Sequence, residues 1–327
     1  MYRAIRISKV DDRLHHELVM REDDDLDEGD VIVSIDFSTV NYKDGLAITN
    51  KSPVIQRFPM TPGIDFSGTV VASDSPDFAI GDKVVANGWG LSQSHDGGFA
   101  ERARVPSDWL IRLPDGIDTK HAAAIGTAGY TAMLSILALE HNGLEPDHGD
   151  ILVTGASGGV GSVAIALLSK LGYRVVASTG RLDEADYLMQ LGAAEVIDRA
   201  MLAQQGKPIG RERWAGVVDA VGSNTLVNAL AQTKYGGVVT ACGLAQGVDL
   251  SGSVLPFILR GVTLAGIDSV NAPKRLRIDA WNRLASDLDL EKLDAMVTTV
   301  SLANAPDISQ QILSGTIKGR TLVDVNI

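Results

Sequence analysis

The pattern of hydrophobic and polar positions divides the chain into a strand-rich beginning and a part in which strands and helices alternate. Short β-branched runs bounded by Gly, Pro, Asp and Asn occupy residues 30–36, 66–72 and 82–86, and such runs predict strands. Within residues 1–120 they indicate a small, partly open β-barrel. Small and apolar residues then follow helical spacing over residues 121–139, which predicts a helix between two domains.

From about residue 150 to 290, strand and helix patterns alternate. Alternation of this kind implies right-handed crossovers and a doubly wound parallel sheet. The six expected strands are residues 150–153, 174–177, 195–197, 216–220, 237–241 and 262–266. A further strand is expected at 319–325, in a last stretch that we expect to return to the first domain. The prediction is an α/β protein with residues 1–122 and 297–327 in one domain and 123–296 in the other.

The strongest local signal lies at residues 151–170, where an apolar run enters a glycine-rich turn and an apolar-periodic segment follows at once. This order predicts a strand, a tight turn and a helix. Gly155, Gly158 and Gly161 suit a turn whose backbone approaches a pyrophosphate, while the helix N-terminus offers unpaired N–H groups to the anion. The candidate cofactor contacts in this turn are Ser157, Gly158, Gly159 and Val160.

The end of the next strand decides which dinucleotide is expected. An NAD site usually carries an acidic residue there, whereas a 2′-phosphate needs small hydroxyls and a cation. The residues at this exit are Ser178, Thr179, Gly180 and Arg181. They predict NADPH. The alternative is that Arg181 only faces solvent and that Asp183 or Glu184 serves the ribose of NAD.

Composition and charge narrow the class of protein. The 327 residues suggest two domains, and 45% hydrophobic with 21% charged residues is typical of a soluble globular protein. A net charge of −12 argues against nucleic acid or an anionic membrane as partner. The acidic segment 22–28 is interpreted as a solvated loop.

Targeting signals and cysteine content point to the cytoplasm. The N-terminus lacks the apolar core of a signal peptide, and we expect no apolar run to approach the ~20 residues of a membrane span. The single cysteine excludes an internal disulfide and fits a reducing compartment.

Several longer motifs resemble those of one enzyme superfamily. Residues 40–44, 62–68, 126–132 and 155–161 resemble the zinc-free, quinone oxidoreductase-like branch of the medium-chain dehydrogenase/reductase superfamily. The segments 41–49, 58–66, 87–90 and 256–260 are similar to the bacterial acryloyl-CoA (acrylyl-CoA) reductases. The resemblance implies a GroES-like first domain and a Rossmann second domain. It also implies NADPH-dependent reduction of the C=C bond of an α,β-unsaturated acyl-CoA, most simply acryloyl-CoA to propionyl-CoA.

Zinc-dependent members of that superfamily bind the metal through Cys and His. Here the one cysteine, Cys242, lies in the nucleotide domain, and Ile64 and Asp65 stand where such enzymes carry a ligand His after Pro-Gly. Zinc requires N or S donors in a tetrahedral array, so we expect no metal. The histidines are expected to be surface or structural residues: His15, His16, His95, His121, His141 and His148.

Reduction of an activated double bond suits a chain without zinc donors. Hydride transfer to the β-carbon leaves negative charge on the carbonyl oxygen, and this charge needs a hydrogen-bond donor. The resemblance places Asn41 and Tyr42 beside the nicotinamide, and they are the candidate catalytic residues. Tyr42 could donate to the enolate, protonate Cα or pack against the cofactor; the alternative is a tyrosine that caps the barrel edge. Lys43 and Asp44 are expected to form an ion pair that orders this loop.

Further cofactor contacts are expected at the carboxyl ends of the other strands, because ligands of doubly wound sheets lie there. The expected contacts at the nicotinamide half are Val221, Gly222, Gly243, Leu244, Ile267 and Asp268. Cys242, beside them, is interpreted as a small buried residue. The phosphates of a CoA thioester would need cations, and the candidates are Lys274, Arg275 and Arg277, or alternatively Lys51 and Arg57. The first three could instead form a solvated helix start.

The run 254–266 is unusually apolar for the last strand region of an open sheet. Such an edge favours pairing with a second copy, and a homodimer is expected. Two alternatives to an acyl-CoA reductase stay open at this point. One is a quinone or general enone reductase without a thioester requirement, and the other is a non-catalytic NADPH-binding sensor.

Overall fold

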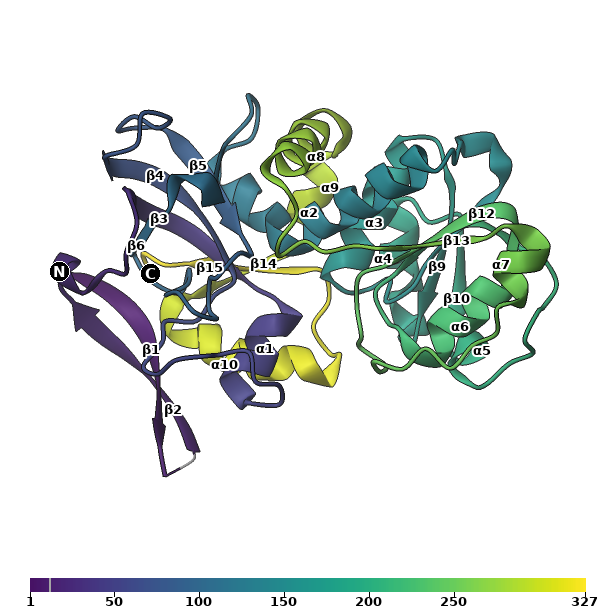
Figure 1. The fold of residues 1–327 in the computed structure, drawn as a ribbon, viewed down its shortest axis with the longest axis horizontal. Helices are drawn as coiled ribbons and strands as arrows, with labels where there is room; N and C mark the ends of the chain where they lie inside the picture. The colour runs from purple at the N-terminus through teal and green to yellow at the C-terminus, as the bar shows by residue number, and fades with distance from the viewer. Residues whose placement is uncertain (12) are drawn as a thin grey trace. The chain divides into compact units, whose positions relative to one another are not determined.

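The computed structural model describes residues 1–11 and 13–327, which form two compact units. The first unit comprises Met1–Thr127, Ser269–Ala285 and Asp294–Ile327, and the second comprises Ala128–Asp268 and Ser286–Leu293. Figure 1 shows that the purple N-terminal strands and the yellow C-terminal strands both belong to the first unit.

The first unit is built on a seven-stranded sheet in the order β14-β15-β3-β4-β5-β7, with β6 paired to β3. Its strands are β3 (Val31–Val40), β4 (Asp65–Ser73), β5 (Lys83–Asn87), β6 (Arg102–Val105), β7 (Leu110–Arg112), β14 (Val297–Ser301) and β15 (Arg320–Asp324). The three strands expected before residue 90 are confirmed as β3, β4 and β5. The return of the C-terminal strand is also confirmed, because β15 pairs antiparallel with β3 and places Thr321 opposite Val40.

A two-stranded antiparallel sheet of β1 (Tyr2–Val10) and β2 (Arg13–Arg21) precedes this main sheet. The polarity pattern did not predict it, because β2 is largely exposed and therefore lacks a clear hydrophobic alternation. β1 nevertheless contributes Ile5 and Ile7 to the hydrophobic core of the unit. The short helices α1 (Tyr42–Thr49) and α10 (Ala305–Gln311) pack against each other although they are far apart in the sequence (Figure 1).

The acidic segment 22–28 is largely exposed, as its charge predicts, with Glu22, Asp24, Asp25 and Glu28 in solvent, but part of it is anchored to the unit. Leu26 in this segment is buried, and Asp23 forms an ion pair with Arg102. The basic partner lies 79 residues further along the chain. A local charge pattern cannot reveal such a partner, since the fold alone brings it into contact.

The second unit contains a six-stranded sheet in the order β10-β9-β8-β11-β12-β13, and every pairing in it is parallel. The strands are β8 (Asp150–Val153), β9 (Arg174–Thr179), β10 (Glu195–Asp198), β11 (Trp214–Asp219), β12 (Thr233–Ala241) and β13 (Thr263–Gly266). All six expected strands and the doubly wound parallel sheet are confirmed. This strand order is that of a Rossmann fold.

Helices connect these strands (Figure 1). The α-helices of the second unit are α3 (Gly159–Lys170), α4 (Ala185–Leu191), α5 (Ala200–Ala203), α6 (Ser223–Gln232) and α7 (Leu255–Arg260), and α8 (Lys274–Asp287) and α9 (Leu290–Ala295) follow. The short 3₁₀ helices are η1 (Asp23–Asp25), η2 (Ser107–Trp109), η3 (Pro146–His148), η4 (Leu182–Glu184), η5 (Leu302–Asn304) and η6 (Ile312–Ser314). In the apolar run 254–266 the strand expected at 262–266 is confirmed as β13, and the residues before it form α7, since Pro256 suits the first turn of a helix.

Helix α2 (Thr119–His141) confirms the helix expected at 121–139. Its backbone is non-helical at Gly126, with φ 50° and ψ −159°, and the division between the two units falls after Thr127. By length and composition α2 could cross a membrane, so the expectation that no apolar run approaches a span was wrong. In this fold 89% of its most apolar window is buried, and a core helix has the same composition because it is surrounded by other side chains.

Candidate active site

The glycine-rich turn between β8 and α3 has the geometry of a dinucleotide turn. Gly155 has φ +58°, a left-handed conformation that favours glycine. A Cβ atom at position 161 would overlap the carbonyl oxygen of Gly155 and lie 2.7 Å from the Cα of Ala156. Helix α3 begins at Gly159 with Gly158 as its N-cap, so its first unpaired N–H groups face the turn.

Hydroxyl groups join this turn to the end of β9. The Oγ of Ser157 and the Oγ1 of Thr179 are 2.9 Å apart, and the backbone N–H of Arg181 donates to the same Oγ1 at 3.1 Å. The guanidinium of Arg181 reaches the carbonyl oxygen of Ser157 at 3.5 Å. The hydroxyl of Ser178 is buried and has no hydrogen-bond partner among the described residues. The exit of β9 therefore gathers small hydroxyls and a cation at the turn.

An acid also lies at this exit. The carboxylate of Glu184 is 3.2 Å from the Nε of Arg181. Arg181 is thus not a residue that only faces solvent, but its charge is shared with a neighbouring carboxylate. The sequence left two alternatives at this exit: Arg181 as a cation for the 2′-phosphate of NADPH, or an acid such as Glu184 for the ribose hydroxyl of NAD. The structure contains both residues, and they contact each other.

Sequence reasoning missed a second arginine at the same place. Arg199 follows β10, whose Asp198 lies opposite Thr179 in the parallel register. A Cβ atom at Gly180 would lie 2.7 Å from the Cζ of Arg199 and would overlap its Nε. The sequence did carry a signal for Arg199. In the strand order of this fold β9 and β10 are neighbours, so the residues that follow these two strands lie at the same edge of the sheet.

The loops after β11, β12 and β13 continue along this edge of the sheet. Asp219, at the end of β11, accepts hydrogen bonds from the Oγ1 of Thr154 and the N–H of Gly222, both at 2.7 Å. Burial raises the pKa of this carboxyl, and these hydrogen bonds oppose the shift. Among the expected contacts, Val221, Gly243 and Ile267 are partly buried and Leu244 and Asp268 are exposed.

Cys242 lies beside these loops and behaves as a buried thiol. Its Sγ donates to the carbonyl oxygen of Asp219 at 3.2 Å. Burial, and secondarily the Asp219 carboxylate, raises its pKa to about 12. A thiol with such a pKa is a poor nucleophile and a poor metal ligand at neutral pH.

In the first unit, Asn41 and Tyr42 lie at the N-terminus of α1, where Asn41 is the N-cap. The carboxylate of Asp44 accepts from the backbone N–H of Asn41 at 2.8 Å and from that of Ile64 at 3.0 Å. Lys43 donates to the side chain of Gln93 at 2.8 Å. A capping box therefore orders the start of α1.

A buried polar network lies directly beneath Asn41. Asp65 accepts from the Nδ2 of Asn41 at 2.9 Å, from the Oγ1 of Thr39 at 2.8 Å and from the N–H of Thr127 at 2.7 Å. Arg320 of β15 donates to the same Thr39 hydroxyl at 3.0 Å and is only 2% exposed. A Cβ atom at Gly126 would lie 2.6 Å from the guanidinium of Arg320, so this network requires glycine at the interruption in α2.

Burial sets the protonation of the charged groups in this network. Desolvation and the neighbouring Asp65 raise the pKa of Asp44 to about 7. Burial lowers the pKa of Arg320, while Asp65 and Asp44 favour its charged form. The charges of two buried carboxyl groups thus act on one buried guanidinium.

The side chain of Tyr42 differs from that of Asn41. Asn41 is 7% exposed and its amide is held by Asp65 and Thr39. Tyr42 is partly buried at the first position of α1, and among the residues that the structure describes its hydroxyl has no hydrogen-bond partner. This hydroxyl is available to a ligand.

Arg277, one of the basic residues considered for CoA phosphates, is part of the core of the first unit. It is 2% exposed and its guanidinium lies 4.0 Å from the ring centroid of Trp89. It also donates to the carbonyl oxygens of Asn87 and Val270, both at 2.6 Å. Arg277 is therefore neither a phosphate ligand nor part of a solvated helix start, because its donors are used by the loops that pack on α8.

Of the other basic residues considered for CoA phosphates, two form ion pairs and two are exposed to solvent. Lys274 lies 3.2 Å from the carboxylate of Asp108, and Arg57 pairs with Asp27. The exposed members of the set are Lys51 and Arg275.

Comparison with known proteins establishes the family. Residues 27–115 match the family described as alcohol dehydrogenase GroES-like domain, and residues 159–286 match the one described as zinc-binding dehydrogenase. The chain belongs to the medium-chain dehydrogenase/reductase superfamily.

Individual relatives cover nearly the whole chain. Acrylyl-CoA reductase AcuI of Ruegeria pomeroyi is 50% identical over 92% of both chains. The yhdH oxidoreductase of Salmonella enterica, crystallised with NADP, is 47% identical, with a TM-score of 0.97 over 99% of both chains. YhfP of Bacillus subtilis, a putative quinone oxidoreductase crystallised with NAD, is 44% identical, with a TM-score of 0.96 over 99% of both chains.

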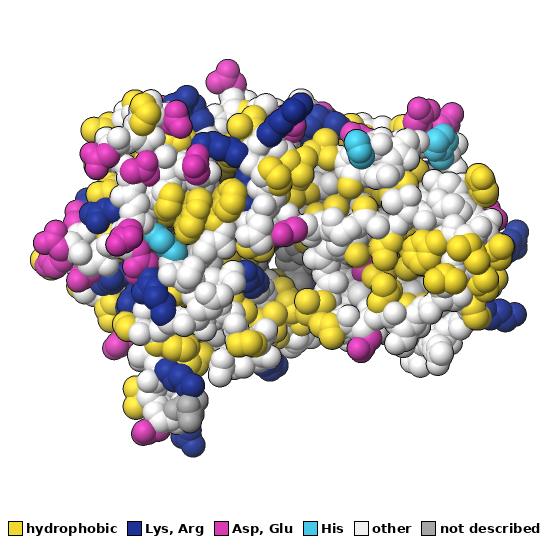
Figure 2. All heavy atoms as spheres, viewed as in Figure 1, with side chains coloured by type: hydrophobic (Ala, Val, Ile, Leu, Met, Phe, Trp, Pro, Cys, Tyr) yellow, Lys and Arg dark blue, Asp and Glu magenta, His cyan; other side chains and the backbone are white. Residues whose placement is uncertain are grey.

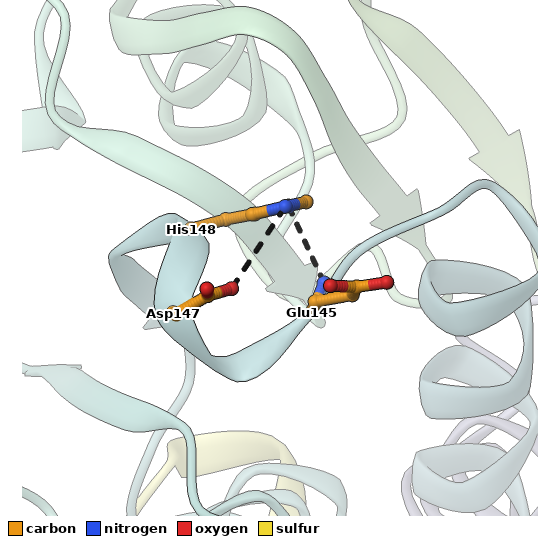
Figure 3. Close-up of side chains that lie close together, drawn as sticks. All are labelled: Glu145, Asp147 and His148. Carbon is orange, nitrogen blue, oxygen red and sulfur yellow. Dashed lines mark hydrogen bonds and ion pairs between the residues drawn. The ribbon is translucent and has the colours of Figure 1, made fainter.

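The zinc in one family description can be tested against the donors of this chain. The described residues contain one cluster of three metal-donor side chains, Glu145, Asp147 and His148. All three are exposed at η3, where the N–H of Glu145 donates to the Nδ1 of His148 at 3.3 Å and Asp147 lies 3.9 Å from its Nε2 (Figure 3). This capping arrangement, together with a protonated Cys242, does not fit the tetrahedral Cys and His site of a catalytic zinc.

Proposed function

We propose that this chain is an NADPH-dependent reductase of α,β-unsaturated acyl-CoA thioesters, most simply of acryloyl-CoA to propionyl-CoA. The observation that carries the proposal is a complete dinucleotide turn with hydroxyls and arginines at the exit of β9, in a chain 50% identical to an acrylyl-CoA reductase. Bound NADPH would supply the hydride that adds to the β-carbon.

The protein's own contribution is to hold the thioester and to stabilise the charge that develops on its carbonyl oxygen. We assign the donor to the hydroxyl of Tyr42, which has no partner among the described residues. Asn41 is assigned a positioning role, because both hydrogen-bonding ends of its amide are engaged within the first unit. It fixes the N-terminus of α1 and hence the place of Tyr42.

We propose that Ser157, Gly158, Gly159 and Val160 bind the pyrophosphate and that the exit of β9 binds the adenosine. The expected contacts after β11, β12 and β13 are assigned to the nicotinamide half, since they end at the same edge of one parallel sheet.

The test compares acceptors and cofactors side by side. NADPH oxidation is followed with acryloyl-CoA, crotonyl-CoA and a benzoquinone at equal concentration, with NADH in a parallel set. We expect the highest kcat/KM for acryloyl-CoA with NADPH. Turnover with the quinone alone would contradict the proposal and would support a quinone oxidoreductase. The similarity of the chain to YhfP favours that alternative. No turnover with any acceptor would favour a non-catalytic NADPH sensor.

We further propose a cytoplasmic homodimer. β13 is the last strand of the second unit's sheet, and the neighbouring α7 leaves Val254, Ile258 and Leu259 between 59% and 68% exposed. Figure 2 shows hydrophobic side chains gathered over the part of the second unit that carries these elements. An unpaired edge beside an apolar helix suits pairing with a second copy. The single cysteine supports a reducing compartment.

A further inference from the structure

We propose that the second unit carries a binding site for a small organic anion in a groove beside α6. The groove has a volume of about 630 Å³, which is in the range of small-molecule sites. Its walls are Met201 of α5, residues of the loop 204–213, and α6 from Asn228 to Gln232. The site goes beyond the proposed reductase function, because none of these residues belongs to the dinucleotide turn.

Two polar side chains fasten the walls of the groove. Asn228 is 6% exposed and donates through its Nδ2 to the carbonyl oxygens of Leu202 at 2.8 Å and Gln204 at 2.6 Å. Arg260, at the end of α7, donates to the carbonyl oxygen of Gly210 at 2.5 Å. The loop is therefore held to the neighbouring helices on both sides, and the groove is a built feature of the unit.

The C-terminal carbonyl groups of α6 adjoin this groove, and free carbonyl groups at a helix end favour a cation. In this structure they are already used. The carbonyl oxygens of Ala229 and Leu230 accept hydrogen bonds from Thr233, and those of Ala231 and Gln232 accept from backbone N–H groups of the loop. The end of the helix therefore has no acceptor left for a cation.

The charged side chains of the groove favour an anion. Lys207 and Arg211 are exposed, and neither forms an ion pair with any residue that the structure describes. The other charges at the groove are paired, since Glu212 lies 3.2 Å from Arg260 and Arg213 lies 2.6 Å from a carboxylate oxygen of Glu195. Two positive charges are thus left uncompensated in a chain whose net charge is −12.

The remaining lining residues indicate the kind of anion. Gln204, Gln205 and Gln232 offer amide groups that both donate and accept hydrogen bonds. Within the described part of the chain no aromatic side chain lines the groove, so a nucleobase would have no ring to stack on. The ligand class is therefore a non-aromatic organic anion with carboxylate or phosphate groups, because both accept charge-assisted hydrogen bonds from Lys and Arg.

The groove is distinct from the cofactor site in the fold. It extends to Arg213 and Gln232, which directly precede β11 and β12, whereas the dinucleotide turn follows β8. All these strands are parallel, so the residues before them and the residues after them lie at opposite edges of the sheet. A ligand in the groove therefore leaves the dinucleotide turn free.

The experiment titrates citrate, and separately glycerol 2-phosphate, into the full chain by calorimetry, with NADPH present to fill the dinucleotide site. We expect wild type to bind at least one of them with a Kd of about 1 mM or tighter. Lys207→Ala and Arg211→Ala should each weaken that binding by about 5- to 10-fold, because each removes one of the two uncompensated charges. Tighter binding of citrate would identify a carboxylate site, and tighter binding of glycerol 2-phosphate a phosphate site.

The matched control is Lys120→Ala, which removes an exposed lysine from α2 in the first unit. It should leave both affinities unchanged. The proposal is overturned if wild type binds neither anion, or if Lys207→Ala and Arg211→Ala both bind as tightly as wild type does. No acceptor is added in these titrations, so their result does not depend on the proposed reductase activity.

Discussion

At the scale of single residues, the polar groups at the start of α1 differ: most hold the loop, whereas the hydroxyl of Tyr42 has no hydrogen-bond partner among the described residues. Asp44, Asp65 and Asn41 bond one another or backbone amides in a buried network closed by Arg320. The hydroxyl of Tyr42 takes no part in it. A side chain whose donor is unused, at the start of a helix that its neighbours fix, is suited to act on a ligand.

Replacing Tyr42 by Phe removes only this hydroxyl. If it stabilises the developing oxyanion, kcat for acryloyl-CoA should fall by about 10²-fold, as for the loss of one oxyanion donor. Binding of NADPH, measured by fluorescence titration, should not change. Tyr235→Phe, at a side chain 79% exposed in the second unit, serves as the control. Unchanged turnover would remove Tyr42 from the mechanism.

Asp44 makes stability depend on pH. Its pKa in the folded protein is raised to about 7 from 3.8, so the folded state binds the proton more tightly than the unfolded state. The free energy of unfolding should therefore fall as pH rises from about 4 to about 7, by at most about 1.4 kcal/mol per pH unit from this group. Urea unfolding of wild type and Asp44→Asn at several pH values checks this, and the variant should show the shallower dependence. Parallel curves would contradict it.

At the scale of elements, the turn between β8 and α3 depends on the close approach of two backbone segments. Gly161 packs on Gly155 and Ala156 with no room for a Cβ atom. The helix therefore lies close enough to the strand for its N-terminus to meet an anion. Glycine is required at position 161 by this close contact and not by its backbone conformation, because Gly161 does not have a positive φ.

Gly161→Ala should force α3 away from the turn. We expect a loss of about 1–3 kcal/mol in the free energy of unfolding and NADPH binding weakened more than tenfold. Gly252→Ala is the control in the same unit, since a Cβ there would make only ordinary contacts with Val227. Equal effects of the two changes in denaturation and binding assays would show that the close approach is not what binds the cofactor.

At the scale of the whole molecule, the apolar surface formed by α7 beside β13 is the observation that supports the proposed homodimer. Three exposed aliphatic side chains adjoin a sheet edge that has no further strand among the described residues. A charge on this surface would have to be buried in the dimer at a cost of several kcal/mol.

Ile258→Asp should therefore convert the dimer into a monomer, as measured by light scattering after size exclusion. Ile258 is 68% exposed, so the folded chain itself should tolerate the change. Ile80→Asp, at a similarly exposed isoleucine in the first unit, should remain dimeric. A monomeric wild type would refute the dimer directly.

The sequence by itself determined the elements that follow from local patterns. Apolar runs and their spacing predicted all six strands of the parallel sheet, and glycines at 155, 158 and 161 predicted the turn, because strand burial and tight turns restrict residue type locally. The resemblance of residues 40–44 to a family motif predicted that Asn41 and Tyr42 lie together in one loop. β2 was missed, since an exposed strand has no hydrophobic alternation, and helix α7 was not predicted within the apolar run 254–266, since a short apolar run fits both structures.

Only the tertiary structure decided which charges meet. It brought Arg199 from another strand to Gly180 and buried Arg277 against Trp89. It also placed Arg320 next to Asp65, more than 250 residues earlier in the sequence. A charged side chain is recognisable in the sequence, but its role depends on partners that long-range strand order and packing select, and no local pattern encodes these.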